Sequence, residues 1–325
     1  MHDFGIFDIN TDIEFEKVAL QIFQFQAKNN AVYREFLSYL NVKSQSITSI
    51  SNIPFLPIQF FKTHQILSVN NTIEKTFLSS GTTGMVQSKH YVTDLSLYMK
   101  SFTKGFEGFY EKIEDLTVFA LLPGYLEREG SSLVYMVDDF IRKSKSEKSG
   151  FYLEDLDKLA GTLKESDKNG EKILLIGVSF ALLDLIENHQ FSLKNTIVME
   201  TGGMKGRRKE LIREELHQIL SKGFGVQNIH SEYGMTELLS QAYSKGKGVF
   251  QTPPWMKVMV RDTEDALSIL SHQKTGGINV IDLANINSCS FIATQDLGKT
   301  YEDGTFEILG RFDNSDIRGC NLMVV

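Results

Sequence analysis

Ile173-Leu174-Leu175-Ile176-Gly177 begins the stretch that decides the fold class of this 325-residue chain. This short apolar run predicts a buried strand, and apolar residues follow at helical spacing between Phe180 and Ile186. A second run, Thr196-Ile197-Val198-Met199, predicts the next strand. A strand, a helix and another strand in this order indicate an α/β fold with a largely parallel sheet flanked by helices.

The same alternation continues on both sides of this stretch. Residues 118–122 before it and 226–230 after it predict two further strands, with a helix near Lys209 to Leu220 preceding the last one. Ligands on such sheets bind beyond the carboxyl ends of the strands. In this chain those ends carry turn residues: Pro123-Gly124, Gly202-Gly203 and Tyr233-Gly234.

The two ends of the chain have different patterns of apolar residues. Residues 11–40 carry apolar side chains at helical spacing. From about Trp255 onward, short strand-like runs alternate with Gly or Asp turns, and Asp303-Gly304 predicts a hairpin. We therefore expect two domains: an α/β core at 1–254 that includes the N-terminal helical segment, and a β-rich subdomain at 255–325.

Composition and charge exclude several classes of protein. The formal net charge of −7 and the lack of a long basic tract argue against nucleic-acid binding. No window approaches the roughly 20 apolar residues of a membrane span, and the N-terminus does not resemble a signal peptide. The two cysteines, Cys289 and Cys320, provide neither a disulfide framework nor metal-site spacing. We expect a cytoplasmic protein.

Ser79-Ser80-Gly81-Thr82-Thr83-Gly84 is a candidate phosphate-binding loop. Its glycines let the backbone turn sharply and approach a ligand, and successive N–H groups can form an anion-binding concavity. The hydroxyl groups add donors that suit phosphate oxygens. It is not a Walker loop, because no Gly-Lys-Ser/Thr ends it. A polar hairpin or flexible loop is the alternative interpretation.

A second candidate site is Ser231-Glu232-Tyr233-Gly234-Met235-Thr236-Glu237. The Thr236 hydroxyl can hold a phosphate oxygen, and the Glu237 carboxylate can hold Mg²⁺ bound to that phosphate. Tyr233 offers a flat face for a base. Farther along, Asp296 can accept hydrogen bonds from ribose hydroxyls. An ordinary strand-to-helix turn and a turn aspartate are the alternatives for these two features.

In this order, the motifs resemble those of the adenylate-forming superfamily of acyl-CoA synthetases, luciferases and related ligases. The resemblance runs from about Phe55 to the end of the chain. It implies binding of ATP and Mg²⁺. It assigns a phosphate loop to Ser79–Gly84, an adenine-side turn to Glu200-Thr201-Gly202-Gly203, and the family's most specific motif to Tyr233-Gly234-Met235-Thr236-Glu237. It also implies a ribose aspartate at Asp296 and a hinge segment at Gly310–Gly319, in which Arg311 reaches the ribose and Asp313 is the pivot.

Two departures from the family pattern concern catalytic lysines. The family often carries a lysine three residues after the last glycine of the loop, whereas the first lysine here is Lys89, with His90 beside it. Either residue could offset developing charge. The family also usually continues past the hinge into a mobile lid with a catalytic lysine, whereas this sequence stops at Val325. We therefore expect the fold without the usual C-terminal lid domain.

One branch of the superfamily shares further segments with this chain: the acyl-protein synthetases of bacterial bioluminescence, which activate fatty acids for a reductase. The similar segments are Pro57–Lys62, Glu127–Leu133 and Ile317–Val324. The resemblance implies that acyl-AMP passes its acyl group to Cys320, with a small buried residue on a terminal strand as the alternative. We expect Cys289 to lie in the core.

The sequence leaves three functions open. The first is activation of a carboxylic acid, fatty by resemblance, followed by transfer to Cys320 and onward to a reductase or carrier protein. The second is a ligase that uses CoA or a carrier protein as a separate thiol acceptor, and the third is a non-catalytic nucleotide-binding module. An oligomer is compatible with all three.

Overall fold

The computed structural model describes residues 4–80, 86–122, 130–202 and 211–312. The chain divides into two compact units. We call Phe61–Gln65 with Asn70–Pro253 the central unit, and Met1–Phe60 with Ile66–Val69 and Pro254–Val325 the terminal unit. Each unit has its own sheet.

The sheet of the central unit confirms the predicted largely parallel α/β fold. Its strand order is β5-β4-β6-β7-β8-β9, and only β9 runs antiparallel to its neighbour. The strands are β4 (Thr117–Leu121), β5 (Gly150–Phe151), β6 (Ile173–Gly177), β7 (Thr196–Glu200), β8 (His230–Tyr233) and β9 (Ala242–Ser244).

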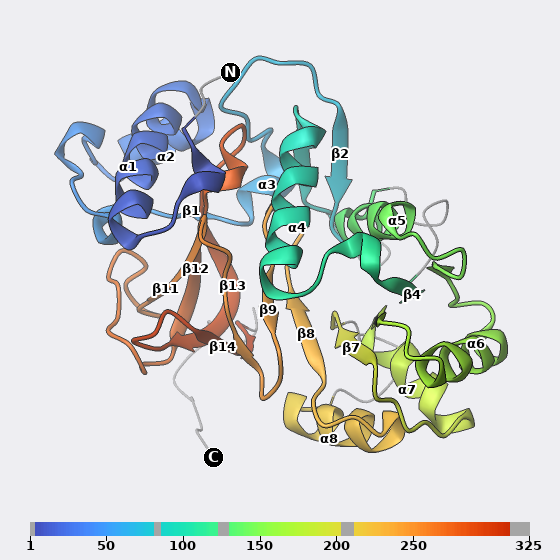
Figure 1. The fold of residues 1–325 in the computed structure, drawn as a ribbon. Helices are drawn as coiled ribbons and strands as arrows, with labels where there is room; N and C mark the ends of the chain where they lie inside the picture. Colours follow the sequence, from blue (N-terminus) through green and yellow to red (C-terminus); the bar gives the residue numbers. More distant parts are fainter. Residues whose placement is uncertain (1–3, 81–85, 123–129, 203–210, 313–325) are drawn as a thin grey trace. The chain divides into compact units, whose positions relative to one another are not determined.

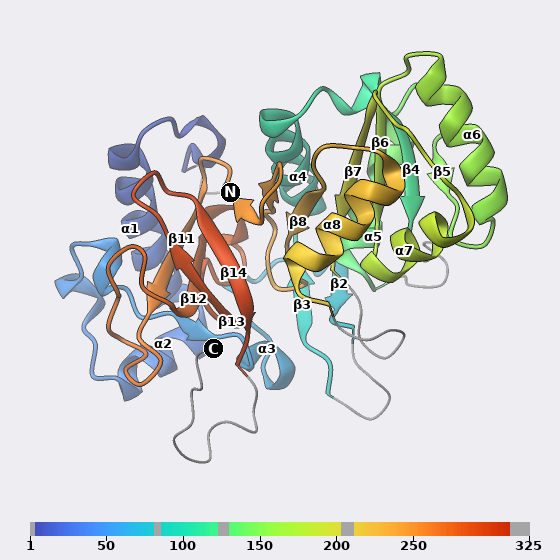
Figure 2. The same ribbon diagram turned by 90° about the horizontal axis from the view of Figure 1, so that it is seen from below.

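Helices cover both faces of this sheet, as Figures 1 and 2 show. On one face, a continuous apolar cluster joins β4, β6 and β7 to α6 (Leu156–Lys168), α7 (Ser179–Asn188) and α8 (Arg213–Phe224). On the other lie α4 (Leu95–Phe109) and α5 (Ser132–Lys143), where Phe106 packs against Phe140 and Tyr243. Burial on both faces explains why β4 and β6 read as unbroken apolar runs.

The last strand of this sheet begins later than the sequence predicts. The sequence predicts a strand at 226–230, whereas β8 spans His230–Tyr233. Gly225 ends α8 in the left-handed conformation, with φ 68°, and the N–H of Val226 bonds to the carbonyl of Ser221. The backbone there is used to finish the helix, so the strand starts later.

A hairpin and short segments complete the central unit. The strands β2 (Lys75–Leu78) and β3 (Lys89–Val92) pair antiparallel and flank the candidate phosphate loop. The remaining elements are β10 (Val249–Phe250), the 3₁₀ turn Ile113–Asp115 and most of α3 (Phe60–Thr63).

The terminal unit combines the N-terminal helices with the C-terminal strands. Antiparallel strands follow the order β11-β12-β13-β14, and β1 lies parallel to β13. Its elements are α1 (Asp12–Asn29), α2 (Ala31–Tyr39), β1 (Leu56–Pro57), β11 (Met256–Arg261), β12 (Gly276–Asp282), β13 (Phe291–Thr300), β14 (Phe306–Arg311) and the 3₁₀ turns Ile6–Asp8, Ser44–Ser46, Ile50–Asn52 and Leu283–Asn285.

This grouping differs from the domain division that we expected, which placed the N-terminal helices with the α/β core. The physical reason is buried pairing between chain ends. The Gln26 amide nitrogen donates to the carbonyl of Ile286 at 2.8 Å, and its oxygen accepts from the N–H of Ser290 at 2.9 Å. Phe23 and Tyr33 pack on Phe291. Sequence periodicity cannot show which distant segment covers an amphipathic helix.

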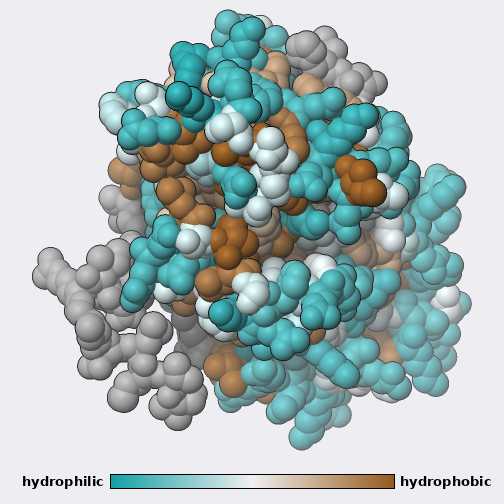
Figure 3. Space-filling model, turned by 90° about the vertical axis from the view of Figure 1, so that its left-hand side faces the viewer, coloured by the Kyte–Doolittle hydropathy of each residue, from teal (hydrophilic) through white to brown (hydrophobic). Residues whose placement is uncertain are grey.

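The surface shows no extended apolar area on the face drawn in Figure 3, where hydrophobic residues form small separate groups among hydrophilic ones. The large exposed hydrophobic side chains belong to different elements, for example Ile13 of α1, Tyr39 of α2 and Leu309 of β14. Single exposed apolar residues of this kind are normal. Within the described ranges, no helix is both long enough and apolar enough to cross a bilayer.

Gly298 should be the most sensitive glycine of the β13–β14 hairpin. A Cβ atom there would lie 2.1 Å from the backbone oxygen of Glu307, whereas Gly310 in the same hairpin has open space. Gly298→Ala should lower the free energy of unfolding by about 2 kcal/mol or more, the cost of overpacking. Gly310→Ala, the control, should change it by less than about 1 kcal/mol. Urea denaturation measures both, and equal effects would contradict this packing.

Candidate functional site

The carboxyl edge of the central sheet holds the predicted adenine-side turn. Two residues after the end of β7, Gly202 has φ 73°, a conformation that favours glycine. Its carbonyl accepts a hydrogen bond from the N–H of Ser179 at 2.8 Å, and the N–H of Thr201 bonds to the carbonyl of Gly177 at 3.1 Å. The turn is thus tied to the end of β6 and the start of α7. Gly203 lies outside the described residues.

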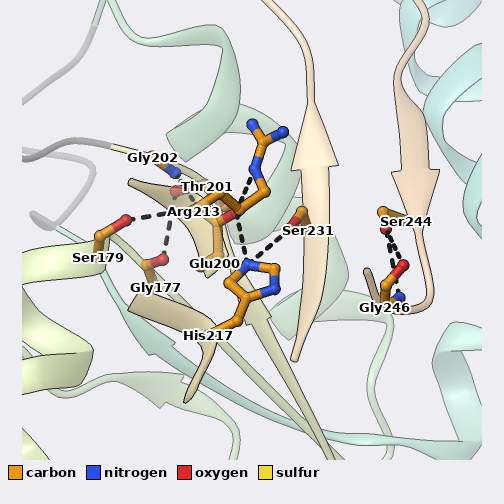
Figure 4. Close-up of polar contacts among 10 residues, drawn as sticks. All are labelled: Gly177, Ser179, Glu200, Thr201, Gly202, Arg213, His217, Ser231, Ser244 and Gly246. Carbon is orange, nitrogen blue, oxygen red and sulfur yellow. Dashed lines mark hydrogen bonds and ion pairs between the residues drawn. The ribbon is translucent and has the colours of Figure 1, made fainter. Parts of the chain in front are cut away.

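A buried carboxylate, Glu200, lies beneath this turn, as Figure 4 shows. Its Oε2 accepts from the N–H of Gly202 at 2.7 Å, and its Oε1 lies 3.5 Å from Nε2 of His217 and 4.0 Å from Nε of Arg213. Burial alone would raise its pKa. Hydrogen bonds from His217, Ser231 and Gly202, with the charge of Arg213, outweigh burial and lower that pKa below its usual value.

Tyr233, the predicted base-stacking residue, ends β8 on the same edge. Its ring contacts that of Phe250 at 5.9 Å between centroids, and the guanidinium of Arg213 lies 5.1 Å from the centre of the Phe250 ring. The tyrosine is partly buried. Its motif begins inside the strand and not after it, because β8 includes Ser231 and Glu232.

The turn that follows carries Thr236 and Glu237. The N–H of Leu238 bonds to the carbonyl of Met235 at 3.0 Å, and the Glu237 side chain is buried. Nδ1 of His90 lies 2.8 Å from the carbonyl oxygen of Thr236. This contact links the β2–β3 hairpin, which flanks the candidate phosphate loop, to the turn that carries the two predicted phosphate and metal ligands.

The base of the candidate phosphate loop is closed by Ser79. Its N–H donates to the carbonyl of Ser88 at 3.1 Å, and its Oγ accepts from the N–H of Ser88 at 2.9 Å. Its carbonyl accepts from the Gln87 side chain at 2.7 Å. The hydroxyl of Ser79 therefore bonds within the hairpin, whereas Ser80 is exposed. The remaining loop residues, Gly81, Thr82, Thr83 and Gly84, lie outside the described part of the chain.

Lys89 and His90 are separated by the strand they share. Adjacent residues on a strand point to opposite faces. His90 is buried, contacts Thr236 and packs edge-on against Phe61 at 5.8 Å, whereas Lys89 is exposed. Of these two candidates, the structure brings His90 to the Thr236 turn.

The predicted ribose residues Asp296 and Arg311 are neighbours in the terminal unit. They are register partners across β13 and β14, and Nε of Arg311 donates to Oδ1 of Asp296 at 2.8 Å. Asp296 is therefore a buried strand residue, not a turn aspartate.

Sequence reasoning did not single out a buried arginine, Arg261, next to this pair. It donates to the carbonyl of Ile278 at 2.7 Å and to that of Thr294 at 2.6 Å. Thr294 in turn accepts from the N–H of Asp296 at 3.1 Å. The sequence gives no local sign that an arginine at the end of a strand is buried and donates to carbonyl groups of two other strands.

Of the two cysteines, the structure describes only Cys289. Cys320 lies outside the described residues. Cys289 is fully buried, as expected of a core residue, and burial raises the pKa of its thiol to about 12. At neutral pH this thiol is protonated and shielded, so Cys289 is a poor nucleophile.

The predicted metal ligand, Glu237, belongs to no cluster of metal-ligating side chains within the described residues. Among them, no group of three or more His, Cys, Asp or Glu residues could hold a metal ion. The single carboxylate of Glu237 remains a candidate ligand, since Mg²⁺ is commonly held by one or two carboxylates together with substrate phosphates.

Glu232 is a further acidic residue that the sequence did not single out. It is partly buried, and its Oε1 would lie 2.4 Å from a Cβ atom on Gly234, so the glycine leaves room for this carboxyl group. Burial and the charge of Glu200 raise the pKa of Glu232 to about 8. The folded protein therefore favours the protonated form.

This raised pKa should make stability depend on pH. The unfolded chain releases the Glu232 proton near pH 4.3, whereas the folded chain retains it to about pH 8, so stability falls as pH rises through this window. Glu232→Gln should raise the free energy of unfolding by up to about 5 kcal/mol at pH 8.5, at about 1.4 kcal/mol for each pH unit by which the two pKa values differ, and by little at pH 4.5. Urea denaturation at both values tests this, with exposed Glu214→Gln as the control. An equal gain at both values would contradict it.

Comparisons with known proteins agree with this architecture. The model of the family described as "Acyl-protein synthetase, LuxE" matches residues 8–102. A search of curated proteins found no match.

Similar solved structures include ATP-bound MatB from Rhodopseudomonas palustris, with 18% identity and a TM-score of 0.57 over 75% of this chain and 49% of that one. An open conformation of 2-hydroxyisobutyryl-CoA ligase, in complex with 2-HIB-AMP and CoA, has 13% identity and a TM-score of 0.64, over 94% and 72%. O-succinylbenzoate coenzyme A synthetase (MenE) from Bacillus subtilis, in complex with AMP, has 17% identity and a TM-score of 0.51, over 76% and 50%.

The chain spans about half the length of the first of these structures. At these identities the likeness concerns the fold. The chain therefore has the fold of adenylate-forming acyl-CoA ligases, and its residues 8–102 match the acyl-protein synthetase family, as the resemblance predicted.

Proposed function

We propose that this chain is an adenylate-forming ligase that activates a carboxylic acid with ATP, giving acyl-AMP and pyrophosphate. The contact between His90 and the carbonyl of Thr236 is the observation that carries the proposal. It links the hairpin of the candidate phosphate loop to the Thr236-Glu237 turn. That turn follows β8, and Gly202 follows the adjacent strand β7. Groups suited to phosphate and to a base therefore converge in one unit.

The phosphates are assigned to the loop and to the Thr236 turn. Ser80 and the four residues that follow it would cradle the departing phosphates with backbone N–H and hydroxyl groups. The Thr236 hydroxyl would hold the α-phosphate. The buried carboxylate of Glu237 would hold Mg²⁺ together with the phosphates, and the ion would supply positive charge against the phosphate oxygens.

The first step needs positioning more than proton transfer. A carboxylate oxygen of the acid attacks the α-phosphorus, the bond from that phosphorus to the bridging oxygen breaks, and pyrophosphate leaves. Catalysis of such reactions consists mainly of holding the reactants in line and stabilising charge. Lys89 or His90 would offset charge on the phosphates, and His90 is favoured because it lies against the Thr236 turn.

The nucleoside is assigned to further residues that the sequence singled out. Tyr233 and the backbone at Gly202 would contact the base. Within the terminal unit, taken by itself, Asp296 is the candidate acceptor for ribose hydroxyls, and Arg311 donates to one of its carboxylate oxygens. The AMP and ATP complexes of the similar ligases support an adenine nucleotide as the ligand.

In the second step, we assign Cys320 as the acyl acceptor and a fatty acid as the substrate. The thiolate attacks the carbonyl carbon of acyl-AMP, a thioester forms and AMP leaves, with the thiol proton lost to solvent. A reductase or carrier protein would then take the acyl group. The family match at residues 8–102 favours this reaction.

A ligase that uses a separate thiol is the second candidate. Its support is the similar 2-hydroxyisobutyryl-CoA ligase, which was solved with both an acyl adenylate and CoA. In that case free CoA would stimulate turnover and Cys320 would be dispensable.

Acid-dependent exchange of pyrophosphate into ATP tests the first step. With a panel of carboxylic acids, the wild-type protein should catalyse exchange, and Thr236→Ala and Glu237→Gln should each slow it ~100-fold, the usual cost of losing one transition-state contact. Glu171→Gln, which changes a carboxylate in the connection between α6 and β6, is the control. Exchange at the wild-type rate in both variants would contradict the assignment, and no exchange with any acid would favour a non-catalytic nucleotide-binding module.

Covalent labelling tests the second step. After incubation with ATP, Mg²⁺ and a radiolabelled fatty acid, denaturing electrophoresis should show a hydroxylamine-labile label on the wild type and on Cys289→Ala. The Cys320→Ser variant should carry none but should still exchange pyrophosphate. Equal label on wild type and Cys320→Ser would overturn the Cys320 assignment.

A further inference from the structure

We infer that Glu200 is a positioning residue for the base of the nucleotide, because its two carboxylate oxygens hold the two elements assigned to that base. The inference rests on the proposed adenine-nucleotide site. One oxygen faces the turn after β7, and the other faces Arg213 and His217 of α8 (Figure 4). Arg213 in turn reaches Tyr233 through Phe250.

The first oxygen fixes the turn. Oε2 of Glu200 accepts the N–H of Gly202 at 2.7 Å and lies 3.4 Å from the hydroxyl of Ser179. A hydrogen bond from a backbone N–H to a carboxylate is short and strong. It holds Gly202 in its left-handed conformation and orients the peptide that would face the base.

The second oxygen acts on Tyr233 through two intermediates. Oε1 lies 4.0 Å from Nε of Arg213, and this guanidinium covers the ring of Phe250 at 5.1 Å. Phe250 in turn packs against Tyr233 at 5.9 Å. Arginine and aromatic rings attract each other in this arrangement. The charge of Glu200 therefore helps to hold the surface on which Tyr233 rests.

His217 completes the pairing of this buried charge. Its Nε2 lies 3.5 Å from Oε1 of Glu200 and 3.4 Å from the hydroxyl of Ser231. A buried carboxylate needs such partners to stay ionised, and these contacts keep its pKa below the usual value. Glu200 is therefore ionised at neutral pH, and its negative charge attracts the guanidinium of Arg213.

A second buried carboxylate provides a matched control at the opposite end of β7. Asp167 accepts from the N–H groups of Lys194 and Asn195 and from the hydroxyl of Thr196. It resembles Glu200 in burial and in bonding to the backbone. Its partners, however, fix the amino end of the strand, away from the edge assigned to the ligand.

The experiment compares the affinities of three single variants and one double variant for AMP and for magnesium pyrophosphate by calorimetry. Glu200→Gln should weaken AMP binding about tenfold, an effect typical of losing one charged hydrogen bond, and change pyrophosphate binding less than twofold. Arg213→Gln should also weaken AMP binding. The double variant should bind AMP no more weakly than Glu200→Gln alone. Asp167→Asn should lower the Tm and leave both affinities unchanged.

Four results would overturn the inference. Two concern Glu200→Gln: wild-type AMP affinity, and an equal loss of AMP and pyrophosphate binding. The third is that the effects of Glu200→Gln and Arg213→Gln on AMP binding add in the double variant. The fourth is wild-type AMP affinity in Arg213→Gln, which decides the matter if Glu200→Gln does not fold. A wild-type protein that binds no AMP would instead overturn the proposed function, and this inference with it. The two failures are therefore distinguishable.

Discussion

The hydrogen bond between His90 and the carbonyl of Thr236 is the contact on which the proposed site depends. The two residues are far apart in the sequence. The sequence of either segment, taken alone, does not establish that it binds phosphate. A glycine-rich loop is often only a turn, and a Thr-Glu pair after a strand is common. The contact of His90 places the β2–β3 hairpin against the Thr236 turn at one edge of a parallel sheet, where such folds bind ligands, and this supports a common role for the two segments.

Several parts of the fold could be predicted because their causes are local. Residues 173–177 form a buried strand because they are continuously apolar and bounded by turns. The Asp303-Gly304 hairpin forms because Gly304, at φ 81°, adopts the conformation that the turn requires. The order of motifs then identified the fold, and the similar structures confirm it.

Other parts could not be predicted because their causes are distant in the sequence. The packing of Gln26 against Ser290 places α1 with the C-terminal strands, and no periodicity reveals that pairing. From the sequence alone Asp296 fits a turn equally well, because nothing local shows that Arg311 lies opposite it on the next strand. Glu232 has a raised pKa because of burial and a neighbouring charge, neither of which a sequence displays.

A crystal structure of the protein with a non-hydrolysable acyl-adenylate analogue tests the central claim most directly. The account predicts that the base lies between the Gly202 turn and Tyr233, that the phosphate contacts Thr236, and that Glu200 keeps its bond to the N–H of Gly202. An analogue bound elsewhere on the molecule, or bound with its phosphate away from Thr236, would contradict the account.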